Sequence, residues 1–180
     1  MLKVAFIGAG RMANVHAPRL KKIPGVEIAG VYDIDPEKSR VFAEQYNIPR
    51  QYVSQEELLA DRTLNGVLMC HYCPDHAAGM TAAMEAGVPF IFCEKPAIRR
   101  MEEGPMLLES AKRSGTKIMI GHHRKHDAIN KKMREIIRSG VLGTLRFAKV
   151  QFCNKWYSRQ WGDYFADYAR SGGTTLDMVT

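Results

Sequence analysis

The sequence has 180 residues, of which 46% are hydrophobic and 25% are charged, so it has the composition of an ordinary globular protein. This length suffices for one buried core, or for one domain with part of another. No window approaches 18 consecutive apolar residues, which argues against a membrane-spanning helix, and Lys3 with a glycine turn close behind it is not typical of a signal peptide. We therefore expect a cytoplasmic protein.

The formal net charge of +7 is unevenly distributed, because residues 95–146 hold 13 Lys and Arg against 5 Asp and Glu. Acidic and apolar residues are interleaved with these cations at helical spacing, which is typical of solvated helix faces, and no nucleic-acid recognition motif accompanies them. Cys70 and Cys73 form a C-x-x-C pair, but no second pair follows and Cys70 ends an apolar run. We expect no nucleic-acid partner, no membrane partner and no bound metal.

The chain begins with an apolar run, residues 4–7, that leads into the sequence GAGRMA. These six residues have the G-x-G-x-x-A spacing of a strand-to-helix turn, in which Gly8 allows the sharp turn and Gly10 lets backbone N–H groups approach a pyrophosphate. A second apolar run, residues 26–32, ends directly at Asp33, where a carboxylate would accept hydrogen bonds from a ribose. This order predicts a dinucleotide site. The alternative is a doubly wound domain whose first turn is empty.

Strands and helices alternate along the chain as far as residue 121. Asp35 before Pro36 and Ser54 before Glu57 are typical of helix N-termini. Short apolar runs predict four further strands, at residues 51–53, 66–70, 88–93 and 117–121. Strict alternation predicts an α/β fold, a Rossmann-type doubly wound parallel sheet whose ligand lies at the carboxyl ends of the strands.

After the sixth strand the pattern changes to a predicted helix over residues 127–139, a longer strand over residues 144–152 and an aromatic tail. These elements predict the start of an incomplete α+β domain. We therefore divide the chain into a dinucleotide-binding Rossmann domain, residues 1–121, and the beginning of a second domain, residues 122–180.

Seven short motifs follow one another along the whole chain: GAGRMA, Asp33, CPDHA, EKP at residues 94–96, GHHRKH, SGVLG, and SGGTTLD ending at Asp177. In this order and spacing they resemble the glucose-fructose oxidoreductase and inositol dehydrogenase type of NAD(P)-dependent oxidoreductases. The resemblance implies a dehydrogenase that transfers a hydride between a nicotinamide cofactor and a secondary alcohol of a sugar, cyclitol or related polyol. It also implies that residues 122–180 begin a substrate and oligomerisation domain, and that the full-length protein is a homo-oligomer.

The resemblance further implies the roles of individual residues. Lys95 would reach the reacting carbon and steady its oxygen, a role that suits a lysine directly after an apolar strand; the alternative is a surface lysine. Asp177 would orient a histidine one helical turn later as general base, but that position is 181, beyond the sequence. A cis peptide bond would precede Pro96. The cofactor would be bound by Gly8, Gly10, Arg11, Met12, Asp33, Ile34, Cys73, Pro74, His76, Glu94, Lys95 and His123.

Asp33 favours NAD over NADP, because its carboxylate accepts ribose hydroxyls but repels a 2′-phosphate, and Ile34 rather than an arginine stands beside it. Lys38 and Arg40 are the cations that could bind such a phosphate if the helix rotated. Without the histidine, we expect this chain to bind NAD and to be inactive as an enzyme. The alternative function is a dinucleotide-sensing, repressor-like protein of the same fold; Lys95 and Asp177 favour the enzyme.

Overall fold

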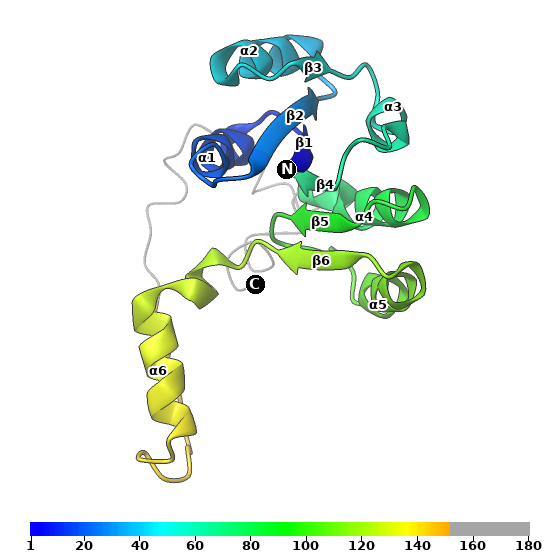
Figure 1. Cartoon of the computed structure of the whole chain (residues 1–180). Coiled ribbons are helices and arrows are strands. Elements are labelled where there is room, and N and C mark those ends of the chain that lie inside the picture. Colours follow the sequence, from blue (N-terminus) through cyan, green and yellow to red (C-terminus); the bar gives the residue numbers. More distant parts are fainter. Residues whose placement is uncertain (152–180) are drawn as a thin grey trace.

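The computed structural model describes residues 1–151, and six of its segments form one parallel sheet in the order β3-β2-β1-β4-β5-β6 (Figure 1). The chain winds outward from β1 in one direction and from β4 in the other, which places a topological switch point between these two strands. The predicted Rossmann-type doubly wound sheet is confirmed. Its strands are β1 (Leu2–Ile7), β2 (Val26–Tyr32), β3 (Arg50–Gln51), β4 (Gly66–Met69), β5 (Phe90–Cys93) and β6 (Lys117–Ile120).

Helices cover both faces of this sheet, so the strands in the middle read as continuous apolar runs. Every residue of β4 is buried. Two helices, α1 (Arg11–Leu20) and α2 (Pro36–Tyr46), pack on one face. The other face carries α3 (Gln55–Ala60), α4 (His76–Glu85) and α5 (Glu103–Ser114).

Alternation along β1 divides its side chains between two hydrophobic clusters, one under each helical layer. Phe6 is fully buried and meets the ring of Phe42 edge to face, with centroids 5.2 Å apart. Ile7 is buried on the opposite face with Met80 of α4. Each such side chain contributes about 1.5–3 kcal/mol by leaving water, which fixes β1 at the centre of the domain.

Both predicted helix caps are present. The Asp35 carboxylate accepts the Glu37 N–H at 3.1 Å, and the Ser54 hydroxyl accepts the Glu57 N–H at 3.1 Å. The carboxylate of Glu57 turns back to the N–H of Val53, at 2.8 Å, and not to that of Ser54. Each cap contributes about 1 kcal/mol to the start of its helix.

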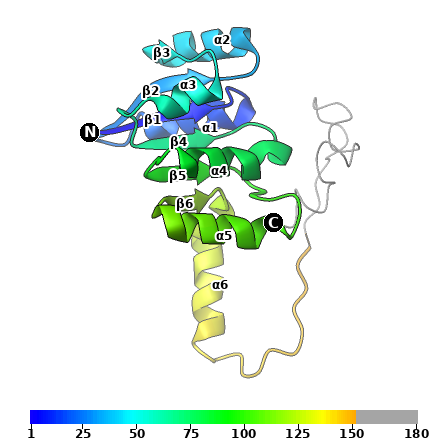
Figure 2. The ribbon, with the colours of Figure 1, turned by 90° about the vertical axis from the view of Figure 1, so that its right-hand side faces the viewer.

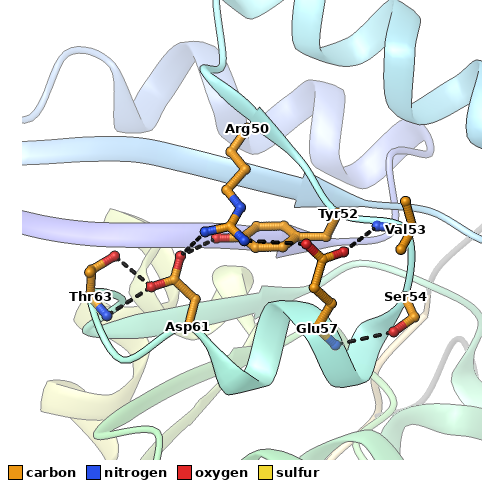
Figure 3. Close-up of polar contacts among 7 residues, drawn as sticks. All are labelled: Arg50, Tyr52, Val53, Ser54, Glu57, Asp61 and Thr63. Carbon is orange, nitrogen blue, oxygen red and sulfur yellow. Dashed lines mark hydrogen bonds and ion pairs between the residues drawn. The ribbon is translucent and has the colours of Figure 1, made fainter.

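A polar network fastens the short edge strand β3 to α3 (Figure 3). The Arg50 guanidinium contacts the carboxylates of Glu57 and Asp61, at 3.2 and 2.9 Å. The Tyr52 hydroxyl donates to Asp61 at 2.7 Å, while the N–H and hydroxyl of Thr63 donate to its second oxygen at 2.9 and 2.7 Å. Hydrogen bonds from Thr63 and then Tyr52 lower the pKa of Asp61 to about 2.

Beyond β6 the chain forms a short 3₁₀ helix, η2 (His123–His126), and then α6 (Ala128–Arg138), which extends away from the sheet past β6 (Figures 1 and 2). The strand predicted over residues 144–152 is wrong for residues 144–151, which form no strand. A strand needs a hydrogen-bonded partner, and these residues pair with no strand in the part of the chain described. The division into two domains stays a prediction.

None of the helices within residues 1–151 is long and apolar enough to span a membrane.

Candidate functional site

The loops after five parallel strands meet at the carboxyl edge of the sheet, and they contain most of the predicted site residues. The glycine turn follows β1. Gly8 has a φ of +96°, and a Cβ on it would lie 2.6 Å from the backbone nitrogen of His71. Its N–H donates to the Tyr32 carbonyl at 2.7 Å. Only glycine fits here, because both the conformation and the space exclude a side chain.

Gly10 differs from Gly8. Its φ of −77° is open to any residue, and no atom of the described chain lies within 4 Å of where its Cβ would be. The chain's own packing therefore does not require glycine at this position, and the open space beside it faces the N-terminus of α1. Arg11 and Met12 are the first two residues of this helix, and within residues 1–151 no side chain caps it, so the positive end of the helix dipole lies at this space.

Asn14 secures the turn and was missed by sequence reasoning. Its side-chain amide donates to the Gly10 carbonyl at 2.9 Å, and its oxygen accepts the Tyr46 hydroxyl at 3.1 Å. The turn is thereby tied to α2 as well as to α1. An asparagine four positions after the second glycine is the signal that could have indicated this contact.

Asp33, directly after β2, has a fixed orientation. Its Oδ2 accepts the N–H of Ala9 at 2.7 Å and its Oδ1 accepts the N–H of Asp35 at 2.9 Å. A carboxylate oxygen accepts more than one hydrogen bond, so both oxygens retain capacity for a ligand. Ile34 beside it is 88% exposed.

The two cations near Asp33 are engaged with acids of their own helix. Lys38 lies 3.5 Å from the carboxylate of Asp35. The guanidinium of Arg40 contacts Glu37 and Glu44 at 2.6 and 2.5 Å.

The loop after β5 holds Glu94, Lys95 and Pro96. Glu94 is only 4% exposed; its Oε1 lies 2.6 Å from Nε2 of His16 on α1, and its Oε2 accepts the Lys95 N–H at 3.2 Å. Lys95 is half-buried, and the Lys95–Pro96 peptide is cis, as the motif implied. The carboxyl group of Glu94 is thus engaged inside the protein.

His76 is buried, with 1% exposed, although the motif implied a cofactor contact. Its Nδ1 lies 2.7 Å from the Pro96 carbonyl and its Nε2 lies 3.1 Å from the His71 carbonyl. Burial lowers the pKa of His76, and the hydrogen bond to the Pro96 carbonyl opposes this effect. The ring joins the loops after β4 and β5, and its nitrogens are not presented to a ligand.

Two further residues at the end of β4 lie near the site. Burial lowers the pKa of His71, whose backbone packs on Gly8 and whose Nε2 has no hydrogen-bond partner within residues 1–151. Burial raises the pKa of the Cys70 thiol, and the nearby Glu94 carboxyl group adds to the effect. His71 was also missed from the sequence, although it follows a central strand at the switch point.

Three of the remaining predicted residues follow β4 and β6. Cys73 and Pro74 lie in the 3₁₀ helix η1 (Cys73–Asp75), and His123 is exposed at the start of η2. Asp177 lies outside the described residues. Within residues 1–151, no three His, Cys, Asp or Glu side chains gather in a way that could hold a metal ion.

A doubly wound sheet with a glycine turn at its first strand and an acidic residue after its second defines a dinucleotide-binding domain. Residues 2–122 match the oxidoreductase family with an NAD-binding Rossmann fold. The chain belongs to this family, and the family predicted from the motifs is confirmed.

Individual relatives are consistent with this membership. Myo-inositol 2-dehydrogenase of Thermotoga maritima is 27% identical over 179 residues, which cover 99% of this chain and 52% of that protein. The uncharacterized oxidoreductase YrbE of Bacillus subtilis is 30% identical over 96% of this chain and 49% of its own. The structure of myo-inositol dehydrogenase from Lactobacillus casei, in complex with NAD(H) and myo-inositol, has a TM-score of 0.75 and 26% identity, over 80% of this chain and 43% of that chain. The chain spans about half the length of the curated relatives it matches.

Proposed function

We propose that this chain binds NAD and that the protein it represents transfers a hydride between NAD and a secondary alcohol of a sugar, cyclitol or related polyol. The observation that carries the proposal is the convergence of the glycine turn, Asp33 and Lys95 at one sheet edge, each following a different strand. When bound, the nicotinamide supplies a carbon that accepts or donates the hydride.

The residues present fit a dinucleotide. Gly10 leaves space open among the described residues at the N-terminus of α1, where the helix dipole and the backbone N–H groups of the first turn favour a pyrophosphate. Asp33 is held with both oxygens able to accept ribose hydroxyls. Arg11, Met12, Ile34, Pro74 and His123 would complete the surroundings of the cofactor. His76 and Glu94 would act indirectly, because their hydrogen bonds hold the loops after β4 and β5 in place.

NAD is the cofactor that these residues favour over NADP. The Asp33 carboxylate would face a 2′-phosphate with like charge, and Lys38 and Arg40, the cations nearest in sequence, are paired within their own helix. Exposed pairs of this kind are weak, so the carboxylate itself carries most of the discrimination.

Lys95 would act on the substrate oxygen. Its ammonium group, at the end of β5, would polarise a carbonyl or stabilise an alkoxide as the hydride moves. Its backbone is fixed through its own N–H to Glu94, and the next carbonyl is fixed by His76. Asp177 would orient the histidine that takes the hydroxyl proton. We also propose a cytoplasmic homo-oligomer at full length.

The test is polyol-dependent NADH formation by the protein that the complete reading frame encodes. We expect turnover with an inositol or a hexose, and a histidine codon directly after Thr180. Lys95→Ala should lower kcat by about 10²- to 10³-fold, whereas Lys112→Ala, at an exposed position of α5, should leave it unchanged. Tight NAD binding with no reduction by any polyol would contradict the enzyme and favour a dinucleotide sensor.

A further inference from the structure

A buried contact joins the helix of the glycine turn to the loop that carries Lys95. His16 lies on α1, and its Nε2 is 2.6 Å from Oε1 of Glu94. The two side chains are 17% and 5% exposed, so the contact is largely shielded from water. Short hydrogen bonds to a carboxylate are among the stronger ones in proteins.

The second oxygen of the same carboxyl group accepts the Lys95 N–H at 3.2 Å. Glu94 therefore contacts α1 through one oxygen and the Lys95 backbone through the other. A buried carboxyl group without its donors is costly, so the arrangement resists movement of either partner. Helix α1 and Lys95 are coupled through a single side chain.

The surroundings of Glu94 fix its position. The Phe92 ring meets the His16 imidazole edge to face, with centroids 5.0 Å apart and planes at 71°. A Cβ on Gly121 would lie 3.0 Å from the Glu94 Oε1 and 3.1 Å from Cζ of Phe92. Glycine after β6 thus leaves the room that the carboxyl group and the ring occupy.

We propose that His16 is a positioning residue. It acts through Glu94 to hold Lys95 at a fixed position relative to the phosphate-binding end of α1. The inference rests on the proposed function, because a dinucleotide would have its phosphates at the glycine turn and its nicotinamide toward Lys95. Loosening the contact then weakens the interactions of the nicotinamide half and spares those of the ADP-ribose half.

The test compares the affinities of NAD and of ADP-ribose, which lacks the nicotinamide, for the 180-residue chain by calorimetry. His16→Leu fills similar space without a donor, and we expect NAD affinity to fall at least about fivefold while ADP-ribose affinity stays constant. His16→Gln keeps an N–H donor and should restore most of the loss. Gly121→Ala displaces Glu94 from the opposite side and should reproduce the effect, whereas His126→Leu, on exposed η2, should not.

Equal weakening of both ligands by His16→Leu, with no rescue by His16→Gln, would overturn the proposal, because it would show a general structural role. Unchanged NAD affinity in both His16→Leu and Gly121→Ala would overturn it as well. If His16→Leu does not fold, the ratio of the two affinities in His16→Gln and Gly121→Ala decides. A folded wild-type chain that binds neither ligand would contradict the proposed function itself.

Discussion

Two glycines of one turn have different physical reasons to be there. Gly8 is required by the chain, since its φ is +96° and its missing Cβ would collide with His71. Gly10 has an ordinary conformation, and no atom of residues 1–151 lies within 4 Å of where its Cβ would be, so packing in the described part of the chain does not require glycine there. In the proposed function, Gly8 has a folding role and Gly10 has a binding role.

This difference predicts opposite outcomes for matched substitutions. Gly8→Ala should destabilise the fold by about 1–3 kcal/mol or more, because it combines strained backbone with a steric clash. Gly10→Ala should change stability by less than about 1 kcal/mol but weaken NAD binding about tenfold, by keeping the pyrophosphate from the N–H groups. Urea unfolding and calorimetric titration of both variants measure the two effects. Equal loss of stability in both would contradict the distinction.

The second prediction for single residues concerns Asp33. Asp33→Ala should lower NAD affinity about tenfold and leave NADP affinity equal or higher, because ribose acceptors and the repulsive charge are both removed. Asp33→Asn keeps one oxygen and loses the charge, so its NAD affinity should lie between those of the wild-type chain and Asp33→Ala. Titration of both cofactors measures the ratio. Comparable affinities of the wild-type chain for NAD and NADP would contradict the proposed preference for NAD.

Sequence motifs located the glycine turn, Asp33 and the loop of Lys95, because each follows an apolar strand directly. They did not reveal what His76 and Glu94 contact. Those contacts join segments far apart in the chain, such as His16 with Glu94 and His76 with Pro96, and side-chain direction at such distances depends on how the helices pack.

At the scale of elements, the network around Asp61 predicts a pH dependence of stability. Its pKa is lowered in the folded protein to about 2, from an ordinary value near 3.9, so its contribution is present above pH about 4 and is lost as pH falls toward 2. Asp61→Asn should reduce stability at neutral pH by about 1–2 kcal/mol and flatten the decline between those pH values. Urea unfolding across this range measures the decline, with Glu109→Gln, at an exposed position of α5, as control. An unchanged decline would contradict the role of Asp61.

Elements with local signals were predicted well. Asp35 and Ser54 indicated their helices because caps depend on neighbouring residues alone. The strand over residues 144–152 was predicted from an apolar pattern, but a strand also requires a partner, which local sequence does not supply.

At the scale of the whole molecule, α6 predicts self-association of the 180-residue chain. Ile129, Met133, Ile136 and Ile137 are all exposed on this helix, which extends past the sheet. Apolar surface of this kind favours contact with a second copy. Sedimentation should show mass rising with concentration, and Met133→Glu should suppress the rise, whereas Met101→Glu, at an exposed methionine outside α6, should not. A chain that stays monomeric at all concentrations would contradict this.

The measurement that tests the central claim most directly is a titration of the purified, folded 180-residue chain with NAD, followed by addition of inositols or hexoses. We predict saturable NAD binding that is tighter than NADP binding, with no NADH formed above background, because the proposed base falls outside the sequence. Steady turnover abolished by Lys95→Ala would contradict the proposed need for that base. Failure of the folded chain to bind NAD at millimolar concentration would contradict the dinucleotide site itself.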